Sequence, residues 1–590
     1  MVIKLAKTAG FCMGVRRAVS IVMDEVHKSN DKIYTYGPLI HNDQAINLLE
    51  TQNVSIIKDL NKTDIKSKKI VIRAHGVPKE AKKQISEKGG IICDATCPHV
   101  MRAQSLSEKY SHDGYNILII GDKGHAEVLG ILGHSDGKGF VIEKENDINE
   151  LPDNVEKVCV IAQTTQEREH FDKLVEIIKS KYRDVQVFNT ICDSTSRRQK
   201  EVIRLSKEVD AMVIVGGKGS ANTVRLAEIA QSMGTMTFHI ETADDLNIDE
   251  IRKYNDIGVT AGASTPNWII RNVIEKLYDI QQTSKFALTE IFYKFFKILI
   301  QSQIYLAIGA AALTFTTCIM LKVPFAPESS MTNIAQYVIL SFFYVLSMHI
   351  ANRLFILPKG NIALDTIQIF FFKNKNFLII IGFISIIISL YISFKLGMII
   401  FILMILSILL GTLYTFAIFP AFLVNILKYR RLKDIPGSKD IFSAAGWAMS
   451  SVVIPFINSP EKHIIALIPT AIFASTIVLI RSIQSDLREI ENDLFVGKET
   501  IPIVFGIKKT IRFISYTLMG LVIVLILSGV AKILPLTLSL CLTAVPVLSL
   551  LILQLFKKGL LLYSFYYNLL LEGQFILAGL IGLAYYYFIR

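Results

Sequence analysis

The sequence predicts a chain of two unlike parts: an α/β region of three quasi-repeated units, followed by an all-α polytopic membrane bundle of about nine helices. Short Val- and Ile-rich runs alternate with amphipathic stretches in the first part. Long apolar runs fill the second part, and 51% of the 590 residues are hydrophobic, with a mean hydropathy of +0.43. Such values exclude a disordered chain and a small disulfide scaffold, and they are too high for an ordinary soluble enzyme.

The charge of the chain separates the same two parts. Residues 1–280 hold 38 Lys and Arg against 39 Asp and Glu, whereas the remainder holds 25 against 12. The net charge of +12 therefore lies in the apolar part, where basic loops orient membrane helices. We accordingly expect no nucleic-acid partner, a lipid bilayer around the second part, and domains at residues 1–283 and 284–590.

Seven short apolar runs in the first part are predicted to be strands. Near-continuous apolar strands that alternate with helices are typical of α/β folds with parallel sheets. Helices are expected over 166–182 and 195–208. The predicted strands are 69–73, 90–93, 116–121, 157–162, 185–188, 211–216 and 257–262.

Polar residues follow five of these strands directly. Ligands bind outside the carboxyl ends of strands in open α/β sheets. Imidazole, hydroxyl and amide groups, with backbone N–H groups of Gly-rich turns, suit an anion. One such residue alone is more often a cap or turn residue, but five strand ends together favour a shared polar pocket. The residues are His75, His125, Glu127, Thr164, Thr165, Ser220, Asn222 and Ser264.

Three of the seven cysteines, Cys12, Cys97 and Cys192, lie where a loop passes into a helical stretch. The helix dipole stabilises a thiolate at such a junction. Separations of 85 and 95 residues suggest three units with one thiolate each, and they exclude the local spacing of zinc fingers and two-cluster ferredoxins. Three converging thiolates can hold an iron–sulfur cluster in which one iron lacks a protein ligand.

The first residues, MVIKLAKTAGFCMGV, contain no apolar core of about 7–15 residues behind a basic start. We therefore expect no secretory signal peptide, and a first part that stays in the cytoplasm, where thiols remain reduced. Cys159 lies within a predicted strand and is expected to be an inert core residue.

The order of motifs in the first part resembles the 4-hydroxy-3-methylbut-2-enyl diphosphate reductases of the IspH/LytB family. The resemblance covers nearly all of residues 1–281, through AGFCMGVRRAV, YGPLIHNDQ, RAHGVP, DATCPHV, GHAEVLGILGH, QTT and VTAGASTP. It implies a cloverleaf of three α/β units, a [4Fe–4S] cluster on the three junction cysteines, and an electron donor such as a ferredoxin or a flavodoxin.

The same resemblance implies the roles of the pocket residues. Glu127 would be the proton source, assisted by Thr164. One departure is Ala221, which follows Ser220 where the family has a second serine. The implied diphosphate ligands are His41, His75, His125, Ser220, Asn222 and Ser264.

Nine apolar stretches of helix length are found in the second part. Most of them reach a length of about 20 residues, which a helix needs to span a bilayer. Basic residues gather in alternate loops, so the positive-inside rule places the first part in the cytoplasm and Arg590 outside. One stretch, 442–457, is short and contains Pro455. The stretches centre near 310, 344, 386, 409, 450, 472, 522, 543 and 578.

An acidic segment, SDLREIENDLFVGKETIPIVFG, follows the sixth apolar stretch. Its Asp486, Glu489 and Asp493 share one helix face. Acidic residues beside a membrane core are costly and usually functional, and carboxylates with nearby Lys and Arg suit Mg²⁺–diphosphate. A solvated charged face at the end of a helix is the alternative.

This segment resembles the second aspartate-rich motif of UbiA-type prenyltransferases, and it is followed by the expected Gly497, Thr500, Pro502 and Gly506. The resemblance covers about residues 290–590. It implies a prenyl diphosphate substrate held by Mg²⁺.

The first aspartate-rich motif of that family is expected in the segment MHIANRLFILPKGNIALD. Asn352 fits, but Arg353 stands where Asp is expected, and only Asp365 remains as a carboxylate. The expected Mg²⁺–diphosphate residues are therefore Asp365, Asp486 and Asp493.

Three hypotheses follow for the whole chain. The first is a reductase fused to a working prenyltransferase. The second is the same reductase with a catalytically degenerate membrane anchor. The third is a membrane-anchored iron–sulfur redox sensor, which the intact polar pocket argues against, because a sensor needs no diphosphate site.

Overall fold

A computed structural model describes most of the chain. It divides into two compact units, which we call the α/β unit (Met1–Gln281 with Leu494–Gly497) and the helical unit (Gln282–Asp493 and Lys498–Arg590). The described residues are 2–28, 31–151, 156–282, 287–323, 330–356, 366–414, 435–459, 462–496, 500–559 and 565–588.

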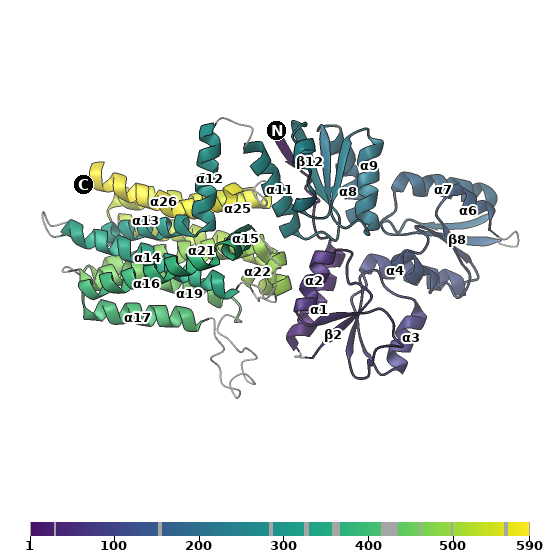
Figure 1. Ribbon diagram of the computed structural model, residues 1–590, viewed down its shortest axis with the longest axis horizontal. Helices are drawn as coiled ribbons and strands as arrows, with labels where there is room; N and C mark the ends of the chain where they lie inside the picture. Colours follow the sequence, from purple (N-terminus) through teal and green to yellow (C-terminus); the bar gives the residue numbers. More distant parts are fainter. Residues whose placement is uncertain are drawn as a thin grey trace. The chain divides into compact units, whose positions relative to one another are not determined.

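The α/β unit contains three lobes, each built on a four-stranded parallel sheet (Figure 1). In the first lobe β2 (Ile33–Tyr36) lies between β3 (Val54–Ile57) and β4 (Lys69–Ile72), and β5 (Ile91–Asp94) lies outside β4. The first strand of the lobe in sequence is thus second in the sheet, and the chain then reverses direction across it.

The second lobe repeats this order. Here β6 (Asn116–Ile120) lies between β7 (Gly139–Ile142) and β8 (Lys157–Ala162), with β9 (Asp184–Phe188) at the edge. The side chains of β6 and β8 are almost fully buried, as expected for strands that carry helices on both faces.

The third lobe has the same order but is completed by the N-terminus. Here β10 (Ala211–Val215) lies between β11 (Met236–Ile240) and β12 (Asp256–Ala261), and β1 (Val2–Leu5) pairs with β12 as the fourth strand. The predicted α/β class and its three repeated units are confirmed.

Five of the twelve strands, namely β1, β2, β3, β7 and β11, are missing from the sequence prediction. Four of them are sheet edges, whose side chains are only partly buried and whose sequences are correspondingly mixed. The fifth, β2, reads IYTY and alternates buried with half-buried residues. The apolar-run criterion finds every central strand except β2, but of the six edge strands it finds only β5 and β9.

Helices connect the strands of each lobe, and α7 (Arg168–Lys181) and α8 (Asp193–Ser206) confirm the two predicted ones. Three helices leave the fourth strand of a lobe and lead into the next: α1 (Met13–Lys28), α4 (Pro98–His112) and α8. The others are α2 (Asp43–Thr51), α3 (Lys79–Glu87), α5 (Ala126–Leu132), α6 (Glu145–Asn149), α9 (Ala221–Ser232), η1 (Ala243–Asp245), α10 (Ile248–Ile251) and α11 (Asn267–Gln282).

The helical unit is all-α over its described residues. A helix lies at or beside each of the nine predicted centres. The helices are α12 (Ala287–Gln301), α13 (Ile304–Met320), α14 (Ser330–Ile356), α15 (Thr366–Lys373), α16 (Lys375–Leu396), α17 (Met398–Leu413), α19 (Ser438–Ala448), α20 (Ile454–Asn458), α21 (Ile464–Val496), α22 (Ile501–Phe505), α23 (Ile507–Val530), α24 (Leu536–Leu542), α25 (Ala544–Lys557) and α26 (Phe565–Phe588).

Within the described residues, seven helices are long and apolar enough to cross a membrane, or eight if the pair α12–α13, bent by 78°, counts as one span. The stretch near Pro455 is among the seven, because a π-helical turn at Met449–Val453 joins α19 to α20. The stretch at 398–413 is apolar but shorter. Large apolar side chains such as Phe383 and Ile399 point outward, as expected on a lipid-facing surface.

Candidate functional site

The polar residues predicted at strand ends follow the first and third strands of each lobe. These two strands are neighbours in each sheet. The order in which the chain adds strands to the sheet reverses at this pair. Such switch points form a crevice at the carboxyl ends of the strands. His41 and His75 follow β2 and β4, His125, Glu127 and Thr164 follow β6 and β8, and Ser220, Asn222 and Ser264 follow β10 and β12.

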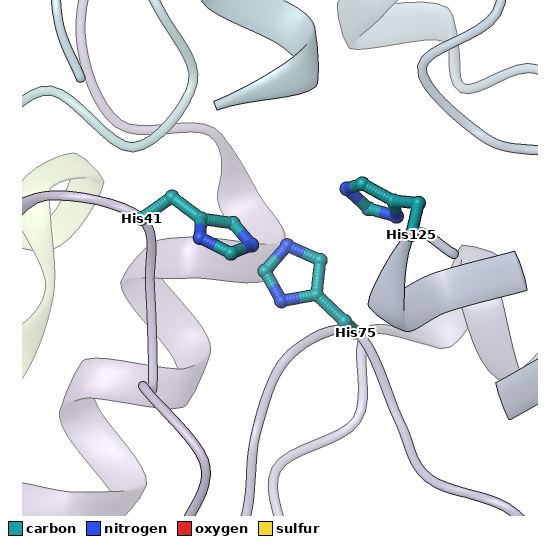
Figure 2. A group of neighbouring side chains, drawn as sticks. All are labelled: His41, His75 and His125. Atoms are coloured by element: carbon teal, nitrogen blue, oxygen red, sulfur yellow. The ribbon is translucent and has the colours of Figure 1, made fainter. Parts of the chain in front are cut away.

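Three histidine rings from two lobes converge in this region (Figure 2). The ring centroid of His41 lies 4.7 Å from that of His75 and 6.0 Å from that of His125, and the last two are 5.7 Å apart. One ring nitrogen of each lies within 4.8 Å of the others. The two sheets therefore deliver their imidazoles to a single pocket.

The electrostatics of this pocket favour an anion. Burial lowers the pKa of all three histidines, to about 4 for His125, and the nearby Arg73 guanidinium lowers them further. The rings are thus neutral near pH 7, and His41 Nε2 and His75 Nδ1 are buried with no hydrogen-bond partner among the described residues. A fixed cation beside three neutral imidazoles suits a diphosphate better than a metal cation.

The third lobe adds neutral donors. Ser264 Oγ donates a hydrogen bond of 3.1 Å to the backbone oxygen of His41, which ties the third lobe to the first. Asn222 is 5% exposed, yet neither its amide nitrogen nor its oxygen has a partner. Ser220 is the N-cap of α9 but makes no capping hydrogen bond. These groups are free to bind an anion at the helix N-terminus.

Glu127 is the buried acid of the pocket, with an exposed fraction of 1%. Its carboxylate accepts hydrogen bonds from the backbone nitrogen of Thr164 at 2.6 Å and from Thr164 Oγ1 at 2.9 Å. Burial raises the pKa of Glu127 to about 7 despite these bonds. A carboxyl group that titrates near neutral pH is suited to proton transfer.

Each of the three junction cysteines stands at the start of a helix that leaves the fourth strand of a lobe. Cys97 and Cys192 are the N-caps of α4 and α8, and Cys12 directly precedes α1. Each sulfur accepts backbone N–H hydrogen bonds from the first turn of its helix. Burial is the larger influence, however, and it raises the pKa of Cys97 and Cys192, although the N–H groups of the helix starts lower it.

The donor set fits a polynuclear iron–sulfur cluster. Cys12 interacts electrostatically with both other thiols, and a Cβ added at Gly14 would lie 2.6 Å from Cys97 Sγ and 3.9 Å from Cys12 Sγ. Among the described residues, however, only the histidine group has three ligand atoms within 4.8 Å of one another. The thiols are thus close but too far apart for one tetrahedral zinc, whose sulfur ligands lie about 2.3 Å from the metal.

The glutamate and the thiols belong to one site. The backbone nitrogen of Cys192 donates to the carbonyl of Thr164 at 3.0 Å, while Thr164 holds Glu127. Cys159 does not belong to it, because it is buried in a strand and burial raises its pKa to about 12.

The helical unit contains a second polar group. Asp486 and Asp493 lie on α21, each 1% exposed and close enough to interact. Lys439 Nζ pairs with Asp486 Oδ1 at 2.5 Å. Glu489 is half-buried. Asp365 lies outside the described residues, so the structure does not place the third predicted carboxylate.

The surroundings of this group are basic and ordered. Arg481 pairs with Glu572 at 2.7 Å, and Arg488 donates to Asn568 at 2.8 Å. Asn352 and Arg353 lie in α14, where Arg353 interacts with Glu572. Of the motif that follows, Gly497 lies outside the described residues, Thr500 caps α22, Pro502 lies in its first turn, and Gly506 has a φ of +82° between α22 and α23.

Comparison with known proteins agrees with both resemblances. Residues 3–278 match the family model described as LytB protein, and residues 374–560 match the UbiA prenyltransferase family. The chain is 43% identical over 282 residues to a 4-hydroxy-3-methylbut-2-enyl diphosphate reductase of Alkaliphilus oremlandii, covering 48% of this chain and 100% of that protein. The chain belongs to the LytB family.

Two solved structures are similar to its parts. The E-1-hydroxy-2-methyl-but-2-enyl-4-diphosphate reductase from Plasmodium falciparum is 27% identical, with a TM-score of 0.45 over 46% of this chain and 87% of that one. A UbiA homolog from Aeropyrum pernix is 12% identical, with a TM-score of 0.37 over 47% of this chain and 96% of that one. The LytB part is followed by a part that matches the UbiA family model over residues 374–560, and its described residues include seven helices long and apolar enough to cross a membrane.

Sequence reasoning missed two arginines of the LytB part. Arg17 on α1 donates to the carbonyl of Thr96 at 2.9 Å, directly before Cys97. Arg198 on α8, 3% exposed, donates to the carbonyl of Gly10, two residues before Cys12. Arg17 follows Cys12 by five residues and Arg198 follows Cys192 by six, and this spacing is visible in the sequence. Each arginine holds the loop of a different cysteine, which only the structure shows.

Proposed function

We propose that the LytB part reduces 4-hydroxy-3-methylbut-2-enyl diphosphate to isopentenyl and dimethylallyl diphosphates in isoprenoid biosynthesis. The conversion consumes two electrons and two protons, and the hydroxyl group leaves as water. The observation that carries the proposal is the single site that joins a neutral anion pocket, a buried acid and three thiols. The 43% identity to a reductase of that name supports it.

The diphosphate binds to the neutral donors of the three lobes. His41, His75 and His125 donate ring N–H groups, and Ser220 and Asn222 donate hydroxyl and amide hydrogens. Ser264 donates its hydroxyl hydrogen to the diphosphate in place of its hydrogen bond to the backbone oxygen of His41. Two of these imidazoles and the Asn222 amide have unsatisfied buried atoms, so binding satisfies groups that are otherwise left without partners. With Ala221 in place of a serine, one hydrogen bond comes from the backbone or from water.

Glu127 transfers the protons. Its pKa of about 7 leaves a large fraction of the acid form near neutral pH, and Thr164 fixes the orientation of the carboxyl group. The acid protonates the departing hydroxyl oxygen and, after proton uptake, the allylic carbon skeleton.

Cys12, Cys97 and Cys192 would hold a [4Fe–4S] cluster, which when bound supplies the electrons and a Lewis-acidic iron. An external donor such as a ferredoxin or a flavodoxin would supply electrons in turn. We assign residues 1–283 to this reductase domain and 284–590 to the membrane domain. The basic loops of the membrane domain support a cytoplasmic reductase domain.

The membrane domain is proposed to bind a prenyl diphosphate through Mg²⁺ on Asp486 and Asp493, and to transfer the prenyl group. Two buried carboxylates beside Lys439 support this function. Asp365 is the remaining carboxylate of the first motif. The alternative is that the membrane domain is a catalytically degenerate anchor. In that case prenyl diphosphate binding does not depend on Mg²⁺, on Asp486 or on Asp365.

An anaerobic assay of the purified full-length protein tests the reductase. With a strong reductant and 4-hydroxy-3-methylbut-2-enyl diphosphate, we expect both C5 diphosphates as products. Changing Cys12, Cys97 or Cys192 to Ser should abolish the cluster signal and turnover, whereas the control Cys159→Ser should retain both. A stable zinc site in the anaerobic protein, or cluster and no turnover, would contradict the proposal.

A further inference from the structure

One buried carboxylate of the helical unit has no role in the account above. Asp440 lies in the first turn of α19 and is 1% exposed. Within the residues that the structure describes, neither of its oxygens has a hydrogen-bond partner of standard geometry, although the Ser482 hydroxyl lies close enough to act on it. An uncompensated buried carboxylate is costly, and proteins keep one only where something else neutralises it.

The neighbours of Asp440 are the two aspartates of α21. Asp440 interacts electrostatically with Asp486 and with Asp493. Ser482 precedes Asp486 by one helical turn, so Asp440 faces the turn of α21 that carries Asp486. Three carboxylates from two helices thus share one buried region.

Two cations, Lys439 and Arg481, act on Asp440, and each of them is paired with another carboxylate. Lys439 pairs with Asp486, and its side chain is 48% exposed. Arg481 acts on Asp440 but is paired with Glu572. In the part of the chain that the structure describes, Asp440 itself forms no ion pair. Among the described residues, both Asp440 oxygens and Asp486 Oδ2 are buried without a hydrogen-bond partner, and such carboxylate oxygens suit a divalent cation.

Helix geometry explains why a carboxylate from a second helix is needed. Asp486 and Asp493 are seven residues apart, which separates them by about 10 Å along the axis of α21. One Mg²⁺ accepts oxygen ligands at about 2.1 Å, so Asp486 and Asp493 would act on separate ions and each ion would need further ligands. Asp440 comes from α19 and can approach Asp486 directly.

We propose that Asp440 and Asp486 together ligate a divalent cation, on which a prenyl diphosphate binds with Lys439 as a further contact. The inference rests on the proposed function of the membrane domain and adds its missing carboxylate. It assigns to Asp440 the place that the sequence analysis gave to Asp365. The competing explanation is favourable placement of an acidic residue at a helix N-terminus, but Asp440 accepts no hydrogen bond there.

Binding of Mn²⁺ to the full-length protein in detergent tests the assignment. Free Mn²⁺ is measured by electron paramagnetic resonance during titration, and every variant keeps the reductase part as a constant background. Asp440→Asn and Asp486→Asn should each weaken the affinity at least about tenfold, since each removes a charged ligand. Asp365→Asn and the control Glu290→Gln, which removes a carboxylate paired with Lys294 on α12, should leave it unchanged.

The outcomes separate this inference from the function on which it rests. If Asp486→Asn loses Mn²⁺ but Asp440→Asn keeps it, Asp440 is not a ligand and the proposed metal site stands. Loss in Asp365→Asn with retention in Asp440→Asn would restore the first motif. If no aspartate variant changes Mn²⁺ binding, both the inference and the metal site are wrong.

Thermal unfolding distinguishes a ligand from a structural residue. Trp268 and Trp447 are the two tryptophans of the chain, and Trp447 lies on α19. In a Trp268→Phe background its fluorescence therefore reports on the helix of Asp440. With EDTA, Asp440→Asn should unfold no earlier than the parent, because it removes an unpaired buried charge, and Mg²⁺ should no longer raise its midpoint. A lower midpoint in EDTA with an intact Mg²⁺ shift would make Asp440 structural.

Discussion

The two parts of the chain offer a prenyl diphosphate opposite electrostatic environments. The reductase pocket presents neutral imidazoles, an amide and hydroxyls beside Arg73. The membrane domain presents Asp440, Asp486 and Asp493 with one paired lysine. In the proposed function, the first site accepts an anion directly, whereas the carboxylates of the second accept it through a bound cation. The charge of a site, more than its ligand, therefore decides whether a metal is required.

The largest expected effect is the response of the two sites to a chelator. EDTA should abolish prenyl diphosphate binding by the membrane domain, because its carboxylates then face the anion without a cation. Turnover of the reductase, measured on the same anaerobic preparation, should not change. Mg²⁺ added back should restore binding. If reductase turnover also required Mg²⁺, the contrast between the two sites would be lost.

The next largest effect is expected at Glu127. Glu127→Gln removes the proton but keeps the acceptor oxygen for Thr164, so turnover should fall by about 10²–10⁴-fold while KM stays near the parent value. The cluster signal should persist. A large change in KM instead would place Glu127 in diphosphate binding.

The pH profile sharpens the same test. The acid form of Glu127 is the proton donor, so kcat of the parent should decline as pH rises through about 7. This limb should be absent from the residual activity of Glu127→Gln. A limb that survives in the variant belongs to another group.

Much of this reductase site could be predicted from sequence, and the reason is the parallel sheet. Buried central strands such as β6 and β8 read as apolar runs, so the residues that follow them were identifiable. His41 was reached only by resemblance, because its strand β2 reads IYTY and contains no run of Val and Ile. Sequence identifies strand ends when the strand itself is buried.

The carboxylate at position 440 shows the opposite limit. Lys439 and Asp440 read as the ordinary charged start of a helix, and nothing local in the sequence links them to Asp486. Only the packing of α19 against α21 brings Ser482 and Asp486 beside Asp440. The periodicity of residues within one membrane helix does not predict which other helix it will contact.

An intermediate effect is expected from acid on the histidine pocket. Burial holds the pKa of His125 at about 4, below its ordinary value, so unfolding takes up a proton between about pH 6.5 and pH 4. The α/β unit should therefore lose stability as pH falls through this window, and His125→Asn should lose less. Unfolding followed by Trp268 fluorescence in a Trp447→Phe background measures it. Equal acid sensitivity in both proteins would show that another group titrates.

The smallest expected effect concerns the two arginines that hold the cysteine loops. Arg198→Gln removes the donor to the Gly10 carbonyl, and Arg17→Gln removes the donor to the Thr96 carbonyl. A charged donor to a backbone oxygen typically contributes about 1.5–3 kcal/mol, so each loop should hold its cysteine less firmly. Because all three thiols remain, the cluster should still assemble, but it should be lost several-fold faster in air, as followed by its visible absorbance.

Arg204→Gln is the matched control, since Arg204 lies on the same helix as Arg198 and pairs with Glu208 at the surface. Equal rates of cluster loss in Arg198→Gln and Arg204→Gln would mean that Arg198 does not help to hold the Cys12 loop. The same comparison between Arg17→Gln and Arg204→Gln tests whether Arg17 helps to hold the Cys97 loop.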